Sequence, residues 1–237
     1  MTSLVRERRG EIEILRLNRP ERRNALDTPT LQLLNDALRE LSDDSDVRAV
    51  VLSTTSPDAF CAGADVTEPL DAAGGVARMD AFAELYRLVE EVPAPTIAVC
   101  VGNCVGAGAE IIAGCDLRVA GDNLKLARAG ARLGVPVGPA RLTQLVGLSR
   151  AKELIYTGRP VGADEAVALG LAQRKGPADE AEAIALELAG LIARQSSDGL
   201  RTLKEMFREL EGTADRITYE NDRLLDFQRN SVGLPQG

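Results

Sequence analysis

The chain has 237 residues, 45% hydrophobic and 27% charged, which is typical of one large globular domain or of one domain with a small appendage. It contains no histidine, which excludes histidine-dependent catalytic triads, histidine metal ligands and histidine as a general base. A net charge of −8 and an aromatic content of 3% argue against nucleic acid and anionic membranes as partners.

Residues 1–14 contain no apolar stretch of the kind that a signal peptide requires. The longest charge-free segment, residues 92–109, is interrupted by prolines and glycines, so no membrane span is expected. The four cysteines form no C-x-x-C pair, and three lie in an apolar segment, which favours reduced core thiols. Together these features predict a cytoplasmic chain, and we expect no metal site.

The first elements expected along the chain are a strand, a helix and a second strand. Residues 11–17 alternate between polar and apolar side chains, as a half-buried strand does. Leucines recur at helical spacing within residues 28–41, where we expect Thr28 as the N-cap and Pro29 as the first helical residue. Residues 48–53 form an apolar run that is typical of a buried strand.

The middle of the chain continues this alternation and the last third is helical. The expected elements are a loop at 54–69, a helix at 76–91, a strand at 96–101, a glycine-rich turn at 102–108, a short helix from Ala109, and strands at 117–120 and 124–127. Helical patterns follow at 141–146, 150–156, 163–169, 179–195, 199–211 and 214–229. This order predicts an α/β fold with parallel strands and crossover helices.

The glycine-rich segment 102–110 (GNCVGAGAE) follows a predicted buried strand, where α/β sheets place their ligands. It has neither the Gly-Lys-Ser/Thr of a phosphate loop nor the third glycine of G-x-G-x-x-G. Its spacing is therefore compatible with a backbone that approaches a ligand closely and equally with tight helix packing.

Glu110 is the one charged residue within residues 105–115. An ionised carboxylate there requires a charged partner, such as Arg118 or Arg141, or else favours its neutral form, which suits a general acid or base. Three arginine clusters, at Arg6/Arg8/Arg9, Arg22/Arg23 and Arg128/Arg132, are each interpreted as a solvated face or an anion site. The pair Arg22/Arg23, in the loop after the first predicted strand, is the better candidate for an anion.

Five segments resemble the motifs of the crotonase (enoyl-CoA hydratase/isomerase) superfamily, in the family's order and with its spacing. They are residues 18–26 (NRPERRNAL), 59–66 (AFCAGADV), 101–116, 157–166 (TGRPVGADEA) and 170–172 (GLA). The resemblance covers about residues 5–210. It implies a ClpP/crotonase-type α/β fold, a spiral of ββα units with a helical C-terminal region.

The resemblance also implies an acyl-CoA thioester as the ligand, with coenzyme A as part of the substrate and no separate cofactor. Two backbone N–H groups, which map onto Ala64 and Ala107, are expected to stabilise an enolate-like oxyanion at the thioester carbonyl. Ala107 stands where the family usually has glycine. Further expected contacts with coenzyme A are made by Arg22, Ala62, and the backbone of Asp65 and Val66.

The family's catalytic carboxylates are only half matched in this sequence. The first glutamate of the hydratases maps onto Glu110, whereas the second maps onto Gly130, so this position is vacated. Losing one of two cooperating groups costs on the order of 10²–10⁴ in rate, which leaves slow hydration, isomerisation, decarboxylation or thioester hydrolysis open. Arg128 or Arg132 is expected either to enter the vacated space and bind an acyl carboxylate or to face solvent.

The C-terminal region is shorter than the resemblance leads one to expect. We expect a crotonase-like core at residues 1–190 and a helical trimerisation region at 191–237, giving a homotrimer or a dimer of trimers. The leading hypothesis is an acyl-CoA lyase or isomerase that uses Glu110. A non-catalytic acyl-CoA binding protein and a scaffold that binds no coenzyme A are the alternatives.

Overall fold

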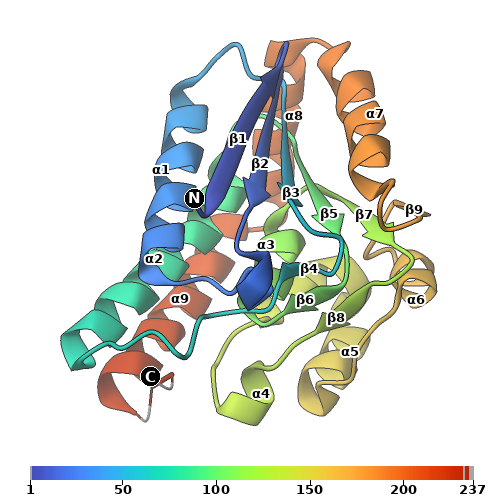
Figure 1. The fold of residues 1–237 in the computed structure, drawn as a ribbon. Coiled ribbons are helices and arrows are strands. Elements are labelled where there is room, and N and C mark those ends of the chain that lie inside the picture. Colours follow the sequence, from blue (N-terminus) through green and yellow to red (C-terminus); the bar gives the residue numbers. More distant parts are fainter. Residues whose placement is uncertain (1, 232, 235–237) are drawn as a thin grey trace.

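A six-stranded sheet forms the centre of the computed structural model, which describes residues 2–231 and 233–234 (Figure 1). Its strands, in chain order, are β1 (Leu4–Arg9), β2 (Ile12–Leu17), β3 (Ala49–Thr54), β5 (Thr96–Cys100), β7 (Leu117–Gly121) and β9 (Arg174–Gly176). They lie side by side in this same order, with β1 antiparallel to β2 and all other neighbours parallel. The predicted parallel pairing with crossover helices is therefore confirmed.

Alternate residues of β3 pack into two different hydrophobic layers, because successive side chains of a strand point to opposite faces. Val50 and Leu52 belong to the larger core, which is covered by α1 (Thr28–Asp43) and α2 (Ala72–Glu91). Ala49 and Val51 belong to a smaller layer together with alanines of α7 (Ala181–Ala193). Helices thus cover both faces of the sheet.

A second, three-stranded parallel sheet lies next to the first and positions the loops of the candidate site. It consists of β4 (Ala59–Cys61), β6 (Asn103–Val105) and β8 (Lys125–Ala127), in this order. A glycine-containing turn follows β4. Helix α3 (Ala107–Gly114) starts directly after β6, and the short α4 (Gly130–Leu133) comes shortly after β8. The ends of all three strands therefore lead into segments that approach one another.

Helices make up most of the chain after α4, which confirms the predicted helical C-terminal region (Figure 1). They are α5 (Pro139–Thr157), α6 (Ala163–Ala168), α7, α8 (Ser197–Leu210) and α9 (Thr213–Asn230). Helix α9 returns to pack against α2 and α5, so the end of the chain lies beside an early helix. The expected boundary between residues 190 and 191 falls inside α7.

Several expected element boundaries were wrong. Helix α1 is capped by Asp27, not Thr28, because the Asp27 carboxylate accepts a hydrogen bond of 3.0 Å from the Thr30 N–H. Helix α3 begins at Ala107, not Ala109, and β6 lies inside the expected turn. The two helices expected at 141–146 and 150–156 are both present within α5, on either side of a kink at the non-helical Gly147 (φ 74°). Strands β1, β4 and β9 and the 3₁₀ helix η1 (Pro20–Arg22) were not predicted.

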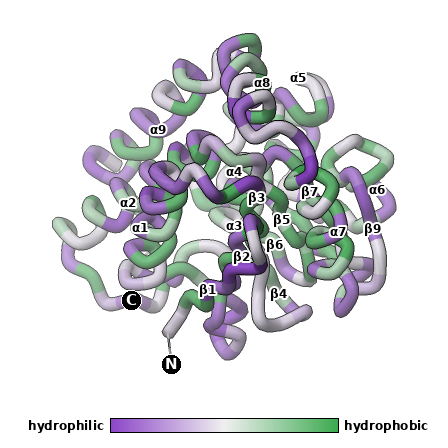
Figure 2. The backbone as a smooth tube through the Cα atoms, turned by 90° about the horizontal axis from the view of Figure 1, so that it is seen from above, coloured by the Kyte–Doolittle hydropathy of each residue, from purple (hydrophilic) through white to green (hydrophobic). Residues whose placement is uncertain are grey.

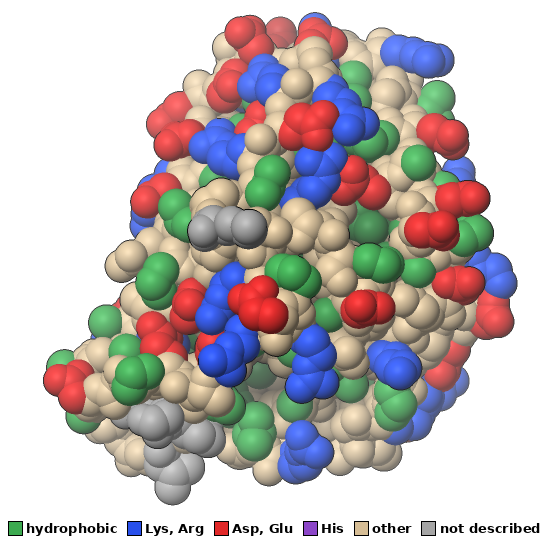
Figure 3. All heavy atoms as spheres, viewed as in Figure 1, with side chains coloured by type: hydrophobic (Ala, Val, Ile, Leu, Met, Phe, Trp, Pro, Cys, Tyr) green, Lys and Arg blue, Asp and Glu red, His purple; other side chains and the backbone are tan. Residues whose placement is uncertain are grey.

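The interior and the surface differ as the composition predicts. Figure 2 shows hydrophobic segments around β5, whereas the peripheral helices α1, α2 and α9 alternate between hydrophobic and hydrophilic residues. Figure 3 shows acidic and basic side chains interspersed over one face. None of the helices within residues 2–231 combines the length and apolar character that crossing a bilayer requires.

Candidate active site

Two turns, one after β4 and one between β6 and α3, meet at the edge of the small sheet. Gly63 in the first turn has a φ of +106° and Gly106 in the second has a φ of +53°, backbone conformations that favour glycine. A Cβ atom placed on Gly63 would lie 3.3 Å from the Val105 carbonyl oxygen and 3.8 Å from the Ala107 nitrogen. The two backbones are therefore in close contact.

The N–H groups of Ala64 and Ala107 have no acceptor within residues 2–231 and 233–234. Ala107 is the first residue of α3, and the first N–H groups of a helix have no intrahelical partner. On either side of Ala64, Leu26 accepts from the Asp65 N–H and donates to the Gly63 carbonyl, both at 2.8 Å. These two hydrogen bonds use the groups of Gly63 and Asp65 and not the Ala64 N–H. The Ala64 N–H is therefore available to a ligand.

An apolar cavity of about 230 Å³ opens at these turns. Of the predicted site residues, Ala62, Ala64, Val66, Ala107 and Gly130 line it. Helix α2 supplies Met79, Phe82 and Tyr86, the segment after α4 supplies Val135 and Val137, and α9 supplies Leu224. The charged side chain among the described lining residues is that of Arg132.

The remaining residues expected to contact coenzyme A lie outside this lining. Arg22 is exposed at the end of η1. The Asp65 side chain is buried and pairs with Arg19 at 3.0 Å. Burial alone would raise the pKa of Asp65, but hydrogen bonds from Thr67 and Arg19 outweigh it and lower the pKa. The Asp65 N–H already donates to Leu26, so it is not free for a ligand.

Glu110 lies one turn after Ala107 in α3, with a side chain that is 2% exposed, and it does not line the cavity. The Arg128 guanidinium donates to its Oε1 atom in a buried ion pair. Its Oε2 atom lies 3.6 Å from Arg141 and has no hydrogen-bond partner among the described residues. Of the two partners expected from the sequence, Arg141 is thus found near Glu110.

Arg118, the other expected partner, instead donates to backbone carbonyls that include Cys115 and Leu171. Arg128 enters the space beside Glu110, whereas Arg132 is exposed at the cavity. The alternative that both arginines face solvent was therefore wrong for Arg128, because its guanidinium is buried against a carboxylate.

Gly130, the position expected to correspond to the family's second carboxylate, is tightly enclosed. A Cβ atom on Gly130 would lie 2.8 Å from the Val135 carbonyl oxygen and 3.3 Å from a methyl carbon of Val137. The Val135 N–H also donates to the Gly130 carbonyl at 2.9 Å. A larger side chain at position 130 therefore requires this backbone to shift.

Arg141 connects Glu110 to two further buried carboxylates. Its Nη1 atom lies 2.8 Å from Glu220, which also accepts from the Gly138 and Ala140 N–H groups at the start of α5. Its Nε atom lies 2.8 Å from Glu90. Burial raises the pKa of Glu220 and raises that of Glu90 to about 7.

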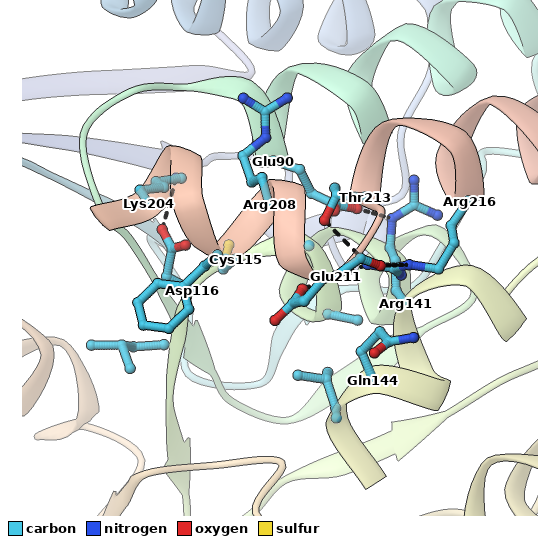
Figure 4. Close-up of a pocket in the computed structure, with 15 residues that line it drawn as sticks. Glu90, Cys115, Asp116, Arg141, Gln144, Lys204, Arg208, Glu211, Thr213 and Arg216 are labelled. Atoms are coloured by element: carbon cyan, nitrogen blue, oxygen red, sulfur yellow. Dashed lines mark hydrogen bonds and ion pairs between the residues drawn. The ribbon is translucent and has the colours of Figure 1, made fainter. Parts of the chain in front are cut away.

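A second cavity, of about 290 Å³, lies between α5, α8 and α9 (Figure 4). Many charged side chains line it, and they pair with one another, as Lys204 does with Asp116 at 2.7 Å and Arg216 with Glu211 at 3.5 Å. Such a wall does not suit an acyl chain, so the apolar cavity at the two turns is the better candidate for a substrate site.

Sequence reasoning missed Tyr86 and did not distinguish Arg128 from Arg132. The helical pattern at 76–91 predicts α2, but it does not show that Tyr86 faces the cavity. Arg128 was grouped with Arg132 by proximity in the chain, although one is buried and the other exposed. The signal for Arg128 is its place immediately after a predicted strand, two residues before Gly130.

The family model described as "Enoyl-CoA hydratase/isomerase" matches residues 7–228. A probable enoyl-CoA hydratase of Mycobacterium bovis is 35% identical over 206 residues, which are 86% of this chain and 80% of that protein. A crotonyl-CoA hydratase of Syntrophomonas wolfei is 30% identical over 98% of this chain and 89% of its own length.

Solved structures agree with these relatives. An enoyl-CoA hydratase of Bacillus anthracis is 26% identical with a TM-score of 0.82, and each chain is covered completely. A probable enoyl-CoA hydratase of Mycobacterium smegmatis is 27% identical with a TM-score of 0.84, covering 95% of this chain and 93% of that one. The expected crotonase-type fold is confirmed, and the chain belongs to the enoyl-CoA hydratase/isomerase family.

Proposed function

We propose that the apolar cavity binds the acyl part of an acyl-CoA thioester, whose carbonyl oxygen accepts hydrogen bonds from the Ala64 and Ala107 N–H groups. The observation that carries this proposal is that two unused amides from different turns border one apolar cavity. Preorganised donors of this kind stabilise the negative charge that develops on the oxygen of an enolate. The N-terminal end of α3 adds its dipole at Ala107.

The coenzyme A moiety is proposed to leave the cavity along the first turn. Ala62 and Val66 line the cavity there, and the Ala62 N–H donates to the carbonyl of Arg23, the neighbour of the exposed Arg22, at 3.0 Å. This proximity supports a path from the apolar acyl site to a cation for the phosphates. No other cofactor is required. A cytoplasmic location and a homotrimer or dimer of trimers stay predictions.

Glu110 is proposed as the general acid/base and corresponds to the first of the two glutamates expected from the resemblance. The second glutamate is absent from the proposed site, because position 130 is glycine. The Oε2 atom of Glu110 has no hydrogen-bond partner among the described residues, which supports a role in holding a water molecule or a proton. The chemistry is the addition of water to a 2-enoyl thioester or the shift of its double bond, both through a thioester enolate.

A second candidate function is non-catalytic binding of acyl-CoA. It is favoured by the ion pair between Arg128 and Glu110, because one oxygen of this buried carboxylate is already engaged by a guanidinium. Gly130 favours it as well, since no carboxylate stands opposite Glu110. Both functions use the same cavity and the same two amides, so turnover distinguishes them.

The test is to incubate the wild type and E110Q with a panel of 2-enoyl and 3-enoyl CoA thioesters, and to follow products by liquid chromatography and mass spectrometry. We expect turnover by the wild type and a loss on the order of 10²-fold or more in E110Q, with calorimetric binding of a saturated acyl-CoA retained. The matched control is E187Q, on the exposed side of α7.

The outcomes separate the two candidates. Equal rates for the wild type and E110Q would remove Glu110 from the mechanism. Saturable binding without turnover of any thioester would support the second candidate instead. If the wild type binds no acyl-CoA in the calorimeter, the proposal fails altogether.

A further inference from the structure

The cavity wall contains few side chains that carry an exchangeable proton. The described lining residues are alanine, glycine, valine, leucine, methionine and phenylalanine, apart from Tyr86 and Arg132. Arg132 is exposed, and its guanidinium is a planar fork of N–H donors without an acceptor, which suits anion binding. Among the described lining residues, Tyr86 is therefore the side chain that is able to give up a proton and take it back.

Tyr86 is held firmly at this wall. It lies on α2, is 5% exposed, and its ring centroid is 6.0 Å from that of Phe82 at a tilt of 32°. The guanidinium carbon of Arg141 lies 4.9 Å from the centroid of the Tyr86 ring, a cation–π distance. The ring thus separates the apolar cavity from the buried charges around Arg141.

Charge and burial keep the Tyr86 phenol in its neutral, proton-bearing form. Burial raises its pKa well above the ordinary value, and the nearby charge of Glu110 raises it further, while Arg141 acts in the opposite direction. The phenol is therefore a hydrogen-bond donor and an acid, not a base, at any pH at which the protein works. It has the protonation state that a donor to a carbanion needs.

We propose that Tyr86 is a second catalytic residue and supplies, from α2, the proton donor that Gly130 leaves out. This inference rests on the proposed function of the cavity. Glu110 and Tyr86 then form an asymmetric pair, a carboxylate that takes a proton and a phenol that gives one. The side-chain requirement of the family's reaction is met with one carboxylate.

Hydration of a 2-enoyl thioester requires one proton to leave the attacking water and one proton to reach Cα. A water O–H bond breaks as the water oxygen bonds to Cβ of the 2-enoyl thioester, and the released proton passes through a relay water to Glu110, which lies behind the cavity wall. The enolate formed at the two amides takes the Tyr86 phenolic proton at Cα. The phenolate then recovers a proton from Glu110, which restores both groups and leaves one water added. Arg141 over the ring stabilises the transient phenolate.

The test compares Y86F with the wild type, because this change removes one hydroxyl and keeps the ring that packs on Phe82 and Arg141. We expect kcat on the wild type's best enoyl-CoA to fall on the order of 10²-fold, with KM changed less than about 3-fold. Calorimetric binding of a saturated acyl-CoA and the unfolding midpoint in urea should stay at wild-type values.

The matched control is Y156F, which removes the same atom from a tyrosine that is 74% exposed and does not line the cavity. Its kcat should equal that of the wild type. A purely structural role for the Tyr86 hydroxyl would lower stability or binding and leave kcat unchanged.

Two results would overturn the inference in distinguishable ways. If the wild type turns over an enoyl-CoA and Y86F does so at the same kcat, Tyr86 is not the donor and the proposed function stands. If the wild type turns over no thioester of the panel, the catalytic function fails first and the role of Tyr86 fails with it.

Discussion

Arg128 and Glu110 form an ion pair whose side chains are 6% and 2% exposed. Removing one partner of such a pair leaves the other charge buried without compensation. We therefore expect R128A to lower the free energy of unfolding by about 3–5 kcal/mol, measured by urea denaturation.

The comparison for R128A is R150A, which removes an arginine from an exposed pair with Glu153 at 3.4 Å. Exposed pairs contribute about 0–1 kcal/mol, so R150A should stay close to the wild type. Similar small losses in both variants would contradict the view that Arg128 compensates a buried charge.

For single residues, the sequence shows which side chains are unusual for their position, but it does not show what surrounds them in the fold. The isolated position of Glu110 and the glycine at 130 are visible in the sequence and need no coordinates. The burial of Arg128 is not visible in the sequence, because it depends on how the start of α5 packs against this arginine. A Cβ atom on Gly138, the N-cap of α5, would lie 3.3 Å from Arg128 Nη1 and 3.4 Å from Glu110 Oε1, so glycine at this position leaves room for the pair.

The second turn is positioned by the close contact between β4 and α3. A Cβ atom on Gly108 would lie 2.3 Å from the Cys61 carbonyl oxygen, closer than real Cβ contacts allow. G108A must therefore push α3 away from β4 and displace the Ala107 amide. We expect it to destabilise the protein by about 1–3 kcal/mol or more in urea denaturation and to weaken acyl-CoA binding in the calorimeter.

Helix α7 offers the matched control, since a Cβ atom on Gly190 would meet nothing within 4 Å. There the same substitution removes a poor helix former, so G190A should stabilise the protein by about 0.5–1 kcal/mol. A G108A variant as stable as G190A would show that the contact with Cys61 does not fix α3.

Elements with a long periodic pattern were easier to predict than short ones, although the three-residue strand β8 was expected at 124–127. The leucine spacing predicts α1, and the apolar runs predict β3 and β5, because burial imposes a period on many residues. Strands β4 and β9 have three residues each, too few to show a period. Helix α2 was expected, but which of its faces lines the cavity follows from its packing against α1 and α9.

At the scale of the whole molecule, two pairs of carboxylates have pKa shifts of opposite sign. Near the surface, hydrogen bonds from arginines lower the pKa of Glu153 and Glu165, so these groups favour folding above acidic pH. Inside, burial raises the pKa of Glu90 and Glu220. Glu90 and Glu220 therefore lower the free energy of unfolding as pH rises, because they must ionise while buried. The net charge of the chain does not reveal this effect.

For Glu90, the direction in which stability changes with pH follows from its pKa values in the folded and the unfolded protein. Its pKa is raised from 4.5 to about 7 in the folded protein, so between these values the folded state binds more protons than the unfolded state. Stability is therefore fully present below pH 4.5 and is lost as pH rises through about 7. A shift of this size corresponds to about 3 kcal/mol.

In the variant E90Q, a neutral amide replaces the titrating carboxyl group beside Arg141. Its stability relative to the wild type should rise by about 2–3 kcal/mol between about pH 5 and about pH 8, because the wild type must charge a buried carboxyl group and the variant need not. Urea denaturation of both proteins at the two pH values measures this difference, with E187Q on exposed α7 as the control. A stability difference that is the same at both pH values would mean that Arg141 already compensates the charge of Glu90 in the folded protein.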